Sequence, residues 1–148
     1  MNWSRIVDQF DCFKRSEIMS KVRSFNTTPE LAIRKLLHGM GYRFRLHRKD
    51  LPGKPDIVLP KYNVVIFVNG CFWHGCPLCN HALIRPKTNN DYWNNKLDRT
   101  LERDKKNIVA LKKLGWRVLT VWECQTKKKV IDRLENKLTI YFQKIRKD

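Results

Sequence analysis

Short apolar runs bounded by turn residues predict a small set of strands in this chain. The runs Asp56–Leu59 and Asn63–Val68 are almost wholly apolar, and the connection Lys61–Tyr62 is short enough for an antiparallel hairpin. The segment Tyr42–Arg48 alternates apolar and basic residues, which is typical of a half-buried strand. A further strand is expected at Trp116–Trp122. The first three strands should therefore form an antiparallel meander.

Apolar residues at helical spacing predict helices around these strands. Thr28 precedes Pro29, which suits the first helical position, and Gly41 stops the same helix. A long helix between the last two strands implies a parallel crossover connection. The sequence thus predicts an α/β fold in which a mixed sheet is flanked by helices. The other helices are expected at Ser16–Arg23, Asp91–Leu114 and Lys128–Lys144.

The length of 148 residues is typical of one domain, and no repeat, linker or low-complexity segment interrupts the chain. We therefore expect a single domain over residues 1–148, with residues 1–15 as a flexible N-terminal arm. No apolar run approaches the roughly 20 residues of a membrane helix. The first residues also lack the apolar run and cleavage site of a secretory signal. A cytoplasmic location without a membrane partner is expected.

The charge balance points to a polyanionic partner. The chain has 31 Lys and Arg residues against 14 Asp and Glu residues, and the resulting net charge of +17 is spread along its whole length. Five Trp, seven Phe and four Tyr residues offer surfaces that can stack on bases. Nucleic acid is therefore the expected partner. The alternative is a generically basic protein or a membrane-surface binder, but no basic amphipathic segment with an aromatic face stands out.

A cysteine cluster predicts a structural metal site. Three cysteines lie within nine residues, and another follows far downstream at the end of the last predicted strand. A tight cluster plus one distant ligand is how structural zinc ties two elements together, and four thiolates leave no open position for water. The alternative is a set of buried thiols; His81 could also replace one sulfur, and Cys12 is expected to be a lone thiol. The zinc ligands expected are Cys71, Cys76, Cys79 and Cys124.

Three other side chains form a candidate catalytic set. Asp56 follows the LPGKP turn and opens a strand, Glu30 lies on the preceding helix, and His74 lies within the cysteine cluster. Phosphodiester hydrolysis uses hard oxygen ligands for magnesium and a group that moves a proton near neutral pH. The structural alternatives are a turn residue for Asp56, a helix-dipole partner for Glu30 and a zinc-adjacent residue for His74.

Three motifs carry a resemblance to the very-short-patch-repair DNA mismatch endonucleases. They are LPGKPDIVLPKYNVVIFVNGCFWHGC, YWNNKLDRTLERDKKNI and LGWRVLTVWEC, and the resemblance extends from about Ser16 to Cys124. It implies a core like that of the restriction endonucleases of the PD-(D/E)xK type. It also implies a magnesium-dependent nick in double-stranded DNA, 5′ to the thymine of a T:G mismatch left by deamination of 5-methylcytosine. Such bacterial enzymes usually accompany a cytosine-5 DNA methyltransferase; we expect a monomer that works at the nucleoid.

The resemblance implies roles for individual residues by matching position. Asp56 corresponds to the carboxylate that bridges magnesium ions, and the backbone carbonyl of Val68 to a further metal ligand. Glu30 corresponds to the active-site helix glutamate, and His74 to the histidine that acts through metal-bound water. The cysteines already named fill the zinc positions. The wedge pushed between base pairs beside the mismatch corresponds to Met19, Phe72 and Trp73, of which we expect the Phe72–Trp73 pair to be exposed.

The sequence also departs from the best-known members of that family. They have a second active-site histidine where this chain has Asn69, which we expect either to support a metal-bound water or to mark a rearranged site. Cys76 replaces a histidine among the zinc ligands, and the strand after Asp56 supplies no Asp/Glu-x-Lys motif. Two other functions remain open at this point: a restriction endonuclease that cuts both strands of matched DNA, and a noncatalytic zinc-stabilised DNA-binding protein.

Overall fold

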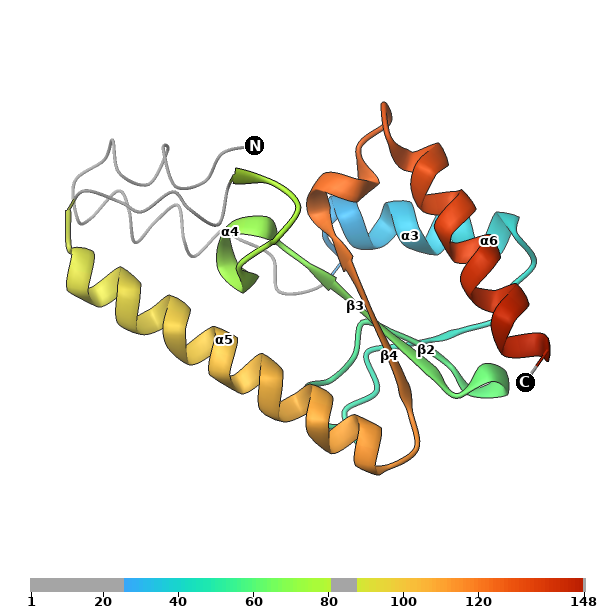
Figure 1. Ribbon diagram of the computed structural model, residues 1–148, viewed down its shortest axis with the longest axis horizontal. Helices are drawn as coiled ribbons and strands as arrows, with labels where there is room; N and C mark the ends of the chain where they lie inside the picture. Colours follow the sequence, from blue (N-terminus) through green and yellow to red (C-terminus); the bar gives the residue numbers. More distant parts are fainter. Residues whose placement is uncertain (1–25, 81–87, 148) are drawn as a thin grey trace.

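A mixed sheet with strand order β1-β2-β3-β4 forms the centre of the described part of the chain (Figure 1). The computed structural model describes residues 26–80 and 88–147. Its elements are α3 (Thr28–Gly39), β1 (Arg45–Leu46), β2 (Ile57–Leu59), the 3-10 helix η1 (Pro60–Tyr62), β3 (Val64–Asn69), α4 (Cys71–His74), α5 (Asn90–Lys113), β4 (Arg117–Trp122), the 3-10 helix η3 (Glu123–Thr126) and α6 (Ile131–Lys147).

The strand pairing confirms the predicted topology. β2 pairs antiparallel with both β1 and β3, so the hairpin expected around η1 is present. β3 pairs parallel with β4, from Val64 opposite Arg117 to Asn69 opposite Trp122. α5 supplies the crossover between these two strands, as a parallel connection requires. β3 therefore lies between an antiparallel and a parallel neighbour.

The helices cover both faces of the sheet because the strand residues alternate in direction. Ile57 and Ile66 pack on one face, in a core shared with α3 and α6. Val58 and Val65 pack on the opposite face, against Leu111 of α5. Figure 1 shows α5 on one side of the strands and α3 with α6 on the other. Because both faces are covered, the central strands read as continuous apolar runs rather than as an alternating pattern.

The predicted strand Tyr42–Arg48 is wrong in extent. Only Arg45–Leu46 pairs with β2, and both of these residues are exposed. Tyr42 lies in the core instead, where its ring stacks on Phe142 of α6 at a centroid distance of 4.4 Å. The pairing ends at His47, whose N–H still donates to the Asp56 carbonyl at 3.2 Å and whose φ of +47° then takes the backbone into the left-handed region. The residues of this edge strand lie outside the core, so alternating apolar residues bury little surface there. The alternating pattern therefore predicted a longer strand than the one that forms.

The other boundaries agree with the predicted elements to within a few residues. Thr27, not Thr28, caps α3: its backbone is extended and its side chain accepts a hydrogen bond from the Glu30 N–H at 3.4 Å. α6 begins and ends about one turn later than expected. The predicted helix Ser16–Arg23 and the arm at residues 1–15 lie outside the described residues. No helix in the described part of the chain is long and apolar enough to cross a membrane.

The LPGKP turn that leads into β2 packs closely against α5. Gly53 has a φ of +76°, and a Cβ at this position would lie 3.0 Å from the Cβ of Asn107. Glycine is therefore required here both for the backbone conformation and for the close approach. This turn leads directly to Asp56, the residue before β2.

We expect Gly53→Ala to lower the free energy of unfolding by about 1–3 kcal/mol, because it combines a left-handed φ with a steric clash. Urea titration measures this change. Gly39→Ala is the matched control, since Gly39 lies at the end of α3 with nothing within 4 Å of the position of a Cβ. That control should be neutral or stabilising by up to about 1 kcal/mol. Equal losses in the two variants would contradict the proposed role of the turn.

Candidate active site and metal centres

The Asp56 carboxylate is held by the backbone of the adjacent strand. Its Oδ2 accepts a hydrogen bond from the Val68 N–H at 2.8 Å, and the side chain is only 17% exposed. The antiparallel pairing of β2 with β3 brings the start of one strand to the end of the other, so this bond follows from the hairpin register. The structure thus brings together Asp56 and Val68, two residues that the sequence analysis placed at one metal.

Glu30 and His47 complete a group of three potential metal ligands with Asp56. Their ligand atoms all lie within 4.8 Å of one another. His47 Nε2 is 3.6 Å from Glu30 Oε2, and His47 Nδ1 is 3.9 Å from Asp56 Oδ1. Two ligands about 2.1 Å from one ion can be at most about 4.2 Å apart, so both pairs could reach a common ion. By these two distances, the His47 ring could share a divalent cation with either carboxylate.

Arg34 lies directly beside this group. It follows Glu30 by one turn of α3, and its Nη2 donates to Glu30 Oε2 at 3.1 Å. The same Nη2 lies 2.9 Å from His47 Nε2. Glu30 is buried, with 3% exposure, and also accepts a hydrogen bond from the Asn26 N–H at 2.9 Å. The guanidinium and this backbone N–H compensate the buried Glu30 carboxylate, which would otherwise be costly.

Burial raises the pKa of the Asp56 carboxyl to about 7. The hydrogen bond from the Val68 N–H acts in the opposite direction, and the nearby Glu30 adds to the increase while Arg34 reduces it. A metal-free site therefore holds a proton on Asp56 near neutral pH. A divalent cation would compete with that proton, because an adjacent positive charge favours the carboxylate.

His74 is paired with an acid from the crossover helix rather than with Asp56. Its Nδ1 lies 2.6 Å from Oδ2 of Asp104 on α5. A carboxylate only accepts, so Nδ1 carries the proton and Nε2 remains to accept or donate one. His74 is not a member of the Glu30–His47–Asp56 group. The structure therefore separates the predicted histidine from the predicted carboxylates and gives it a partner of its own.

Asn69 ends β3 and leads into α4. It pairs with Trp122 in the parallel register, and only Gly70 separates it from the first cysteine of the cluster. Asn69 is half-buried. It therefore lies on the backbone between the Asp56 contact at Val68 and the cysteines.

The four predicted cysteines converge on one point. The sulfur atoms of the group all lie within 4.8 Å of one another, and Cys76 Sγ is 3.8 Å from Cys124 Sγ. Four sulfurs about 2.3 Å from a zinc ion in a tetrahedron are about 3.8 Å apart, so the separation fits that metal. The Leu78 N–H also donates to Cys76 Sγ at 3.3 Å. The group consists of Cys71, Cys76, Cys79 and Cys124.

Burial raises the pKa of the Cys71 thiol and raises the pKa of Cys124 to about 11. Buried thiols that face one another keep their protons in the absence of a cation. A zinc ion would replace those protons and bind the thiolates, which is how such sites couple metal binding to folding. His81 and Cys12 lie outside the described residues. Because four sulfurs already fit a tetrahedron, the site requires no histidine ligand.

The expectation of an exposed Phe72–Trp73 pair is wrong for Phe72, which is 7% exposed and belongs to a small core. Trp73 is half-buried and packs against this core at its edge. Its ring lies 5.0 Å from Phe72 and 5.8 Å from Trp93, measured between centroids. Trp93 belongs to α5, so this helix packs against both aromatic rings of α4. Met19 lies outside the described residues.

Several residues near these sites were missed by the sequence analysis. Arg34 could have been found, because a cation four residues after Glu30 on a helix faces the same side. His47 lies opposite Asp56 and its N–H donates to the Asp56 carbonyl at 3.2 Å, but this follows only from a strand register that the sequence does not define. No local sequence pattern distinguishes Asp104, because it is one of many charged residues on α5.

Comparison with known proteins places the chain in a family. Residues 7–80, half of its length, match the family described as DNA mismatch endonuclease Vsr. The chain is 50% identical over 120 residues to the type II nicking enzyme V.XorIIP of Xanthomonas oryzae pv. oryzae, covering 81% of this chain and 87% of the relative. It is 40% identical over 121 residues to the DNA mismatch endonuclease Vsr of Escherichia coli (strain K12), covering 80% and 75%.

A solved structure agrees with this assignment at the level of fold. The catalytic domain of the homing endonuclease I-Bth0305I superposes with a TM-score of 0.55 at 20% identity, covering 81% of this chain and 98% of that domain. The mixed sheet with its flanking helices is consistent with a restriction-endonuclease-like fold, and the family match identifies the protein as an endonuclease. The chain belongs to the DNA mismatch endonuclease Vsr family. DNA is its substrate, and the noncatalytic alternative is not supported.

We expect Cys76→Ser to lose zinc and to lower the melting temperature, because it removes one of the two buried thiols of the four-cysteine group. Elemental analysis of the wild-type protein should find one zinc per chain. Cys12→Ser is the control, since Cys12 is outside the predicted ligand set. Wild-type protein that is folded and free of zinc would contradict the zinc site.

We expect the stability of the magnesium-free protein to fall as the pH rises through 7, because Asp56 then loses a proton that the folded state holds more tightly than the unfolded state. Asp56→Asn removes this titration. The variant should therefore gain stability relative to wild type between pH 5 and pH 8, by about 1–2 kcal/mol. Urea titration at the two pH values measures the gain. Asp50→Asn, at an exposed carboxylate, should show no such gain.

Proposed function

We propose that this endonuclease nicks one DNA strand on the 5′ side of the thymine in a T:G mismatch, with Mg²⁺ as its catalytic ion. The observation that carries the proposal is the Asp56 carboxylate, held by the Val68 N–H and grouped with Glu30, in a member of the DNA mismatch endonuclease Vsr family. Relatives at 40–50% identity are described as mismatch and nicking endonucleases, which favours nicking over double-strand cleavage.

Asp56 and the Val68 carbonyl are the proposed ligands of the magnesium ion. Both offer hard oxygen atoms, which Mg²⁺ prefers, and the Val68 N–H fixes the orientation of the carboxylate. When bound, the ion supplies charge to the phosphate oxygens as they become more negative. Glu30 lies beside Asp56 on α3 and is paired with Arg34, and Asn69 can donate or accept a hydrogen bond beside this site.

His74 is the proposed proton-transfer group. Its pairing with Asp104 fixes the tautomer and leaves Nε2 as the position that takes up or releases a proton. The Asp104 carboxylate also stabilises the imidazolium that proton uptake would produce. The expected products are a 5′-phosphate and a 3′-hydroxyl.

The aromatic residues on α4 are proposed to open the base stack at the mismatch. Trp73 is the more exposed member of the pair, and Lys96 Nζ lies 5.3 Å from its ring centroid. Phe72 supports Trp73 from behind, and Met19 is the third proposed member of the wedge. Inserting apolar groups costs about a few kcal/mol of unstacking, which is lowest where the bases are mispaired. This step would supply the preference for T:G.

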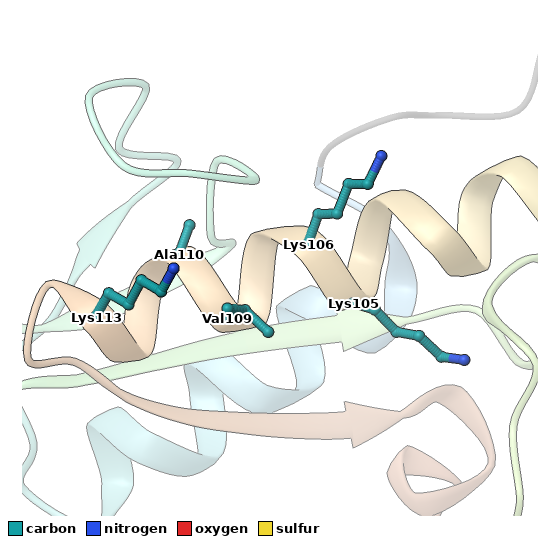
Figure 2. Close-up of a pocket in the computed structure, with 5 residues that line it drawn as sticks. All are labelled: Lys105, Lys106, Val109, Ala110 and Lys113. Atoms are coloured by element: carbon teal, nitrogen blue, oxygen red, sulfur yellow. The ribbon is translucent and has the colours of Figure 1, made fainter.

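Electrostatic attraction to the phosphate backbone is proposed to provide most of the affinity. The net charge of +17 is distributed over the chain. Figure 2 shows an open pocket on α5 whose lining contains three lysines and no acidic residue. The lysine ammonium groups around it could contact backbone phosphates, but the pocket surface itself is mostly apolar and contains no group for the chemical step. The lining residues are Lys105, Lys106, Val109, Ala110 and Lys113.

A single carboxylate site can address one strand at a time, so we propose that the protein acts as a monomer and leaves the opposite strand intact. A T:G mismatch arises when 5-methylcytosine loses its amino group. The enzyme would therefore serve a bacterial cell that also contains a cytosine-5 DNA methyltransferase, and it would work on the DNA of the nucleoid.

The decisive experiment uses a T:G duplex with each strand labelled separately, incubated with the protein and Mg²⁺. We expect one nick, 5′ to the mismatched thymine, and an intact complementary strand. Asp56→Ala should reduce the nicking rate by at least about a thousandfold, because it removes the proposed metal carboxylate. Mismatch binding should largely survive, because phosphate contacts provide most of the affinity.

A matched C:G duplex in the same sequence context is the control for specificity. Cuts in both strands, or equal cutting of the matched duplex, would favour a restriction endonuclease of the same fold instead. Retention of the wild-type nicking rate in Asp56→Ala would refute the proposed site. Asp50→Ala is the matched control, because it removes an aspartate side chain from an exposed position. This variant should nick at the wild-type rate.

A further inference from the structure

The four-cysteine group combines close sulfur contacts with partial access from solvent. Cys76 Sγ lies 3.8 Å from Cys124 Sγ, and the sulfur atoms of the whole group lie within 4.8 Å of one another. Cys71 and Cys76 are buried, whereas Cys79 and Cys124 are only half-buried. A small oxidant can therefore approach Cys124, and the sulfur of a buried cysteine is in contact with it.

A bond between Cys76 and Cys124 would need only a small movement. Disulfide sulfurs are about 2.05 Å apart, so the two atoms would have to approach by less than about 2 Å. Cys76 follows Gly75, the residue that caps α4, and residues 76–79 belong to no helix or strand. Cys124 lies in the short 3-10 helix η3. The approach therefore requires no change in the sheet or in the long helices.

The other sulfur pairs of the group are less suited to bond formation. Cys124 contacts both Cys71 and Cys76 but interacts with Cys79 only electrostatically. Cys71 contacts Cys79 and Cys124, yet it is buried and is the first residue of α4, so a bond from its sulfur would pull on that helix. The geometry therefore favours Cys76 as the partner of Cys124.

We propose that Cys76 and Cys124 form an oxidisable pair, which hydrogen peroxide converts to a disulfide with loss of the zinc site. This inference rests on the proposed zinc site. The Cys124 thiolate attacks one peroxide oxygen, the O–O bond breaks and hydroxide leaves, so that Cys124 becomes a sulfenic acid. The Cys76 thiolate then attacks the Cys124 sulfur, and a second hydroxide leaves. The two sulfurs lose two electrons, the peroxide gains them, and two protons from solvent complete two water molecules.

The disulfide would change the site beyond the two sulfurs that it joins. Only Cys71 and Cys79 would remain as thiolates, which is too few for a closed tetrahedral zinc site. α4 begins at Cys71 and ends at His74, so the helix would lose the metal that holds its first residue. The pairing of His74 with Asp104 would then be supported only from α5. We therefore expect the oxidised form to nick more slowly, and to recover with a thiol reductant and zinc.

The experiment uses the zinc-loaded, DNA-free chain with Cys12→Ser, which leaves the four cysteines of the group. Excess hydrogen peroxide should release the zinc, measured with a chromogenic chelator, and should lower the free thiols from four to two. Trypsin places Cys124 in a different peptide from the other three cysteines, so mass spectrometry should find one cross-linked peptide. Fragmentation should locate the bond at Cys76, and dithiothreitol should remove it.

Cys76→His and Cys79→His are a matched pair of variants. Each replaces one thiolate by an imidazole, which is also a zinc ligand, within the same short segment. Peroxide should still give the cross-linked peptide in Cys79→His, and at least about tenfold less of it in Cys76→His. An equal yield in the two variants would overturn the inference. If either variant does not fold with zinc, the fragmentation of the wild-type peptide decides.

Two further results would overturn the inference. One is a wild-type disulfide confined to the peptide that contains Cys71, Cys76 and Cys79. The other is a chain that keeps its zinc and all four thiols in excess peroxide.

The outcome is separable from that of the nicking experiment, because zinc and thiols are measured without DNA. A Cys76–Cys124 bond in a chain that does not cleave the T:G duplex would refute the proposed function and leave the oxidisable pair intact. Nicking at the mismatch by a chain that peroxide does not oxidise would refute only the inference.

Discussion

The two pairings of β3, antiparallel with β2 and parallel with β4, determine where the two candidate metal groups lie. Val68 ends up beside Asp56 because β3 also pairs with β2, and Asn69 lies opposite Trp122 because β3 pairs with β4. Both strands end at the same edge of the sheet, as parallel strands must. The chain continues from one end into Cys71 and from the other into Cys124. A shift of β3 along both of its neighbours would therefore displace the Val68 amide from Asp56 and separate Cys71 from Cys124.

The carboxylates show how the fold tolerates charge in a partly buried site. Glu30 is buried almost completely, yet a guanidinium and a backbone N–H satisfy it. Asp56 has weaker compensation, and burial raises its pKa to about 7. The contrast separates a carboxylate that is neutralised by an arginine from one that retains a proton more readily when no cation is bound. That difference in compensation, together with the hydrogen bond from the Val68 N–H, supports the proposal that Asp56 is a metal ligand.

Much of this arrangement was predictable from the sequence, and the exceptions have a common physical cause. The hairpin, the crossover and the converging cysteines followed from local signals: apolar runs, a helix between strands and ligand spacing. The short β1 and the burial of Phe72 did not, because each depends on which distant element covers the residue. His47 likewise required the β1–β2 register, and Asp104 required the path of α5 past α4. Long-range packing decides such features, and no local pattern encodes it.

The short helix α4 connects the cysteine group to His74. This helix starts at Cys71 and ends at His74. One helical turn therefore carries both a proposed sulfur ligand and the proposed proton-transfer group. Gly75, at φ +69°, packs its backbone against Leu101, while Asp104 holds the imidazole from the same helix, α5. A helix this short has little stability of its own. Its orientation must come from its two ends, the sulfur cluster and the contacts with α5, and a metal at the cysteines would therefore also order His74.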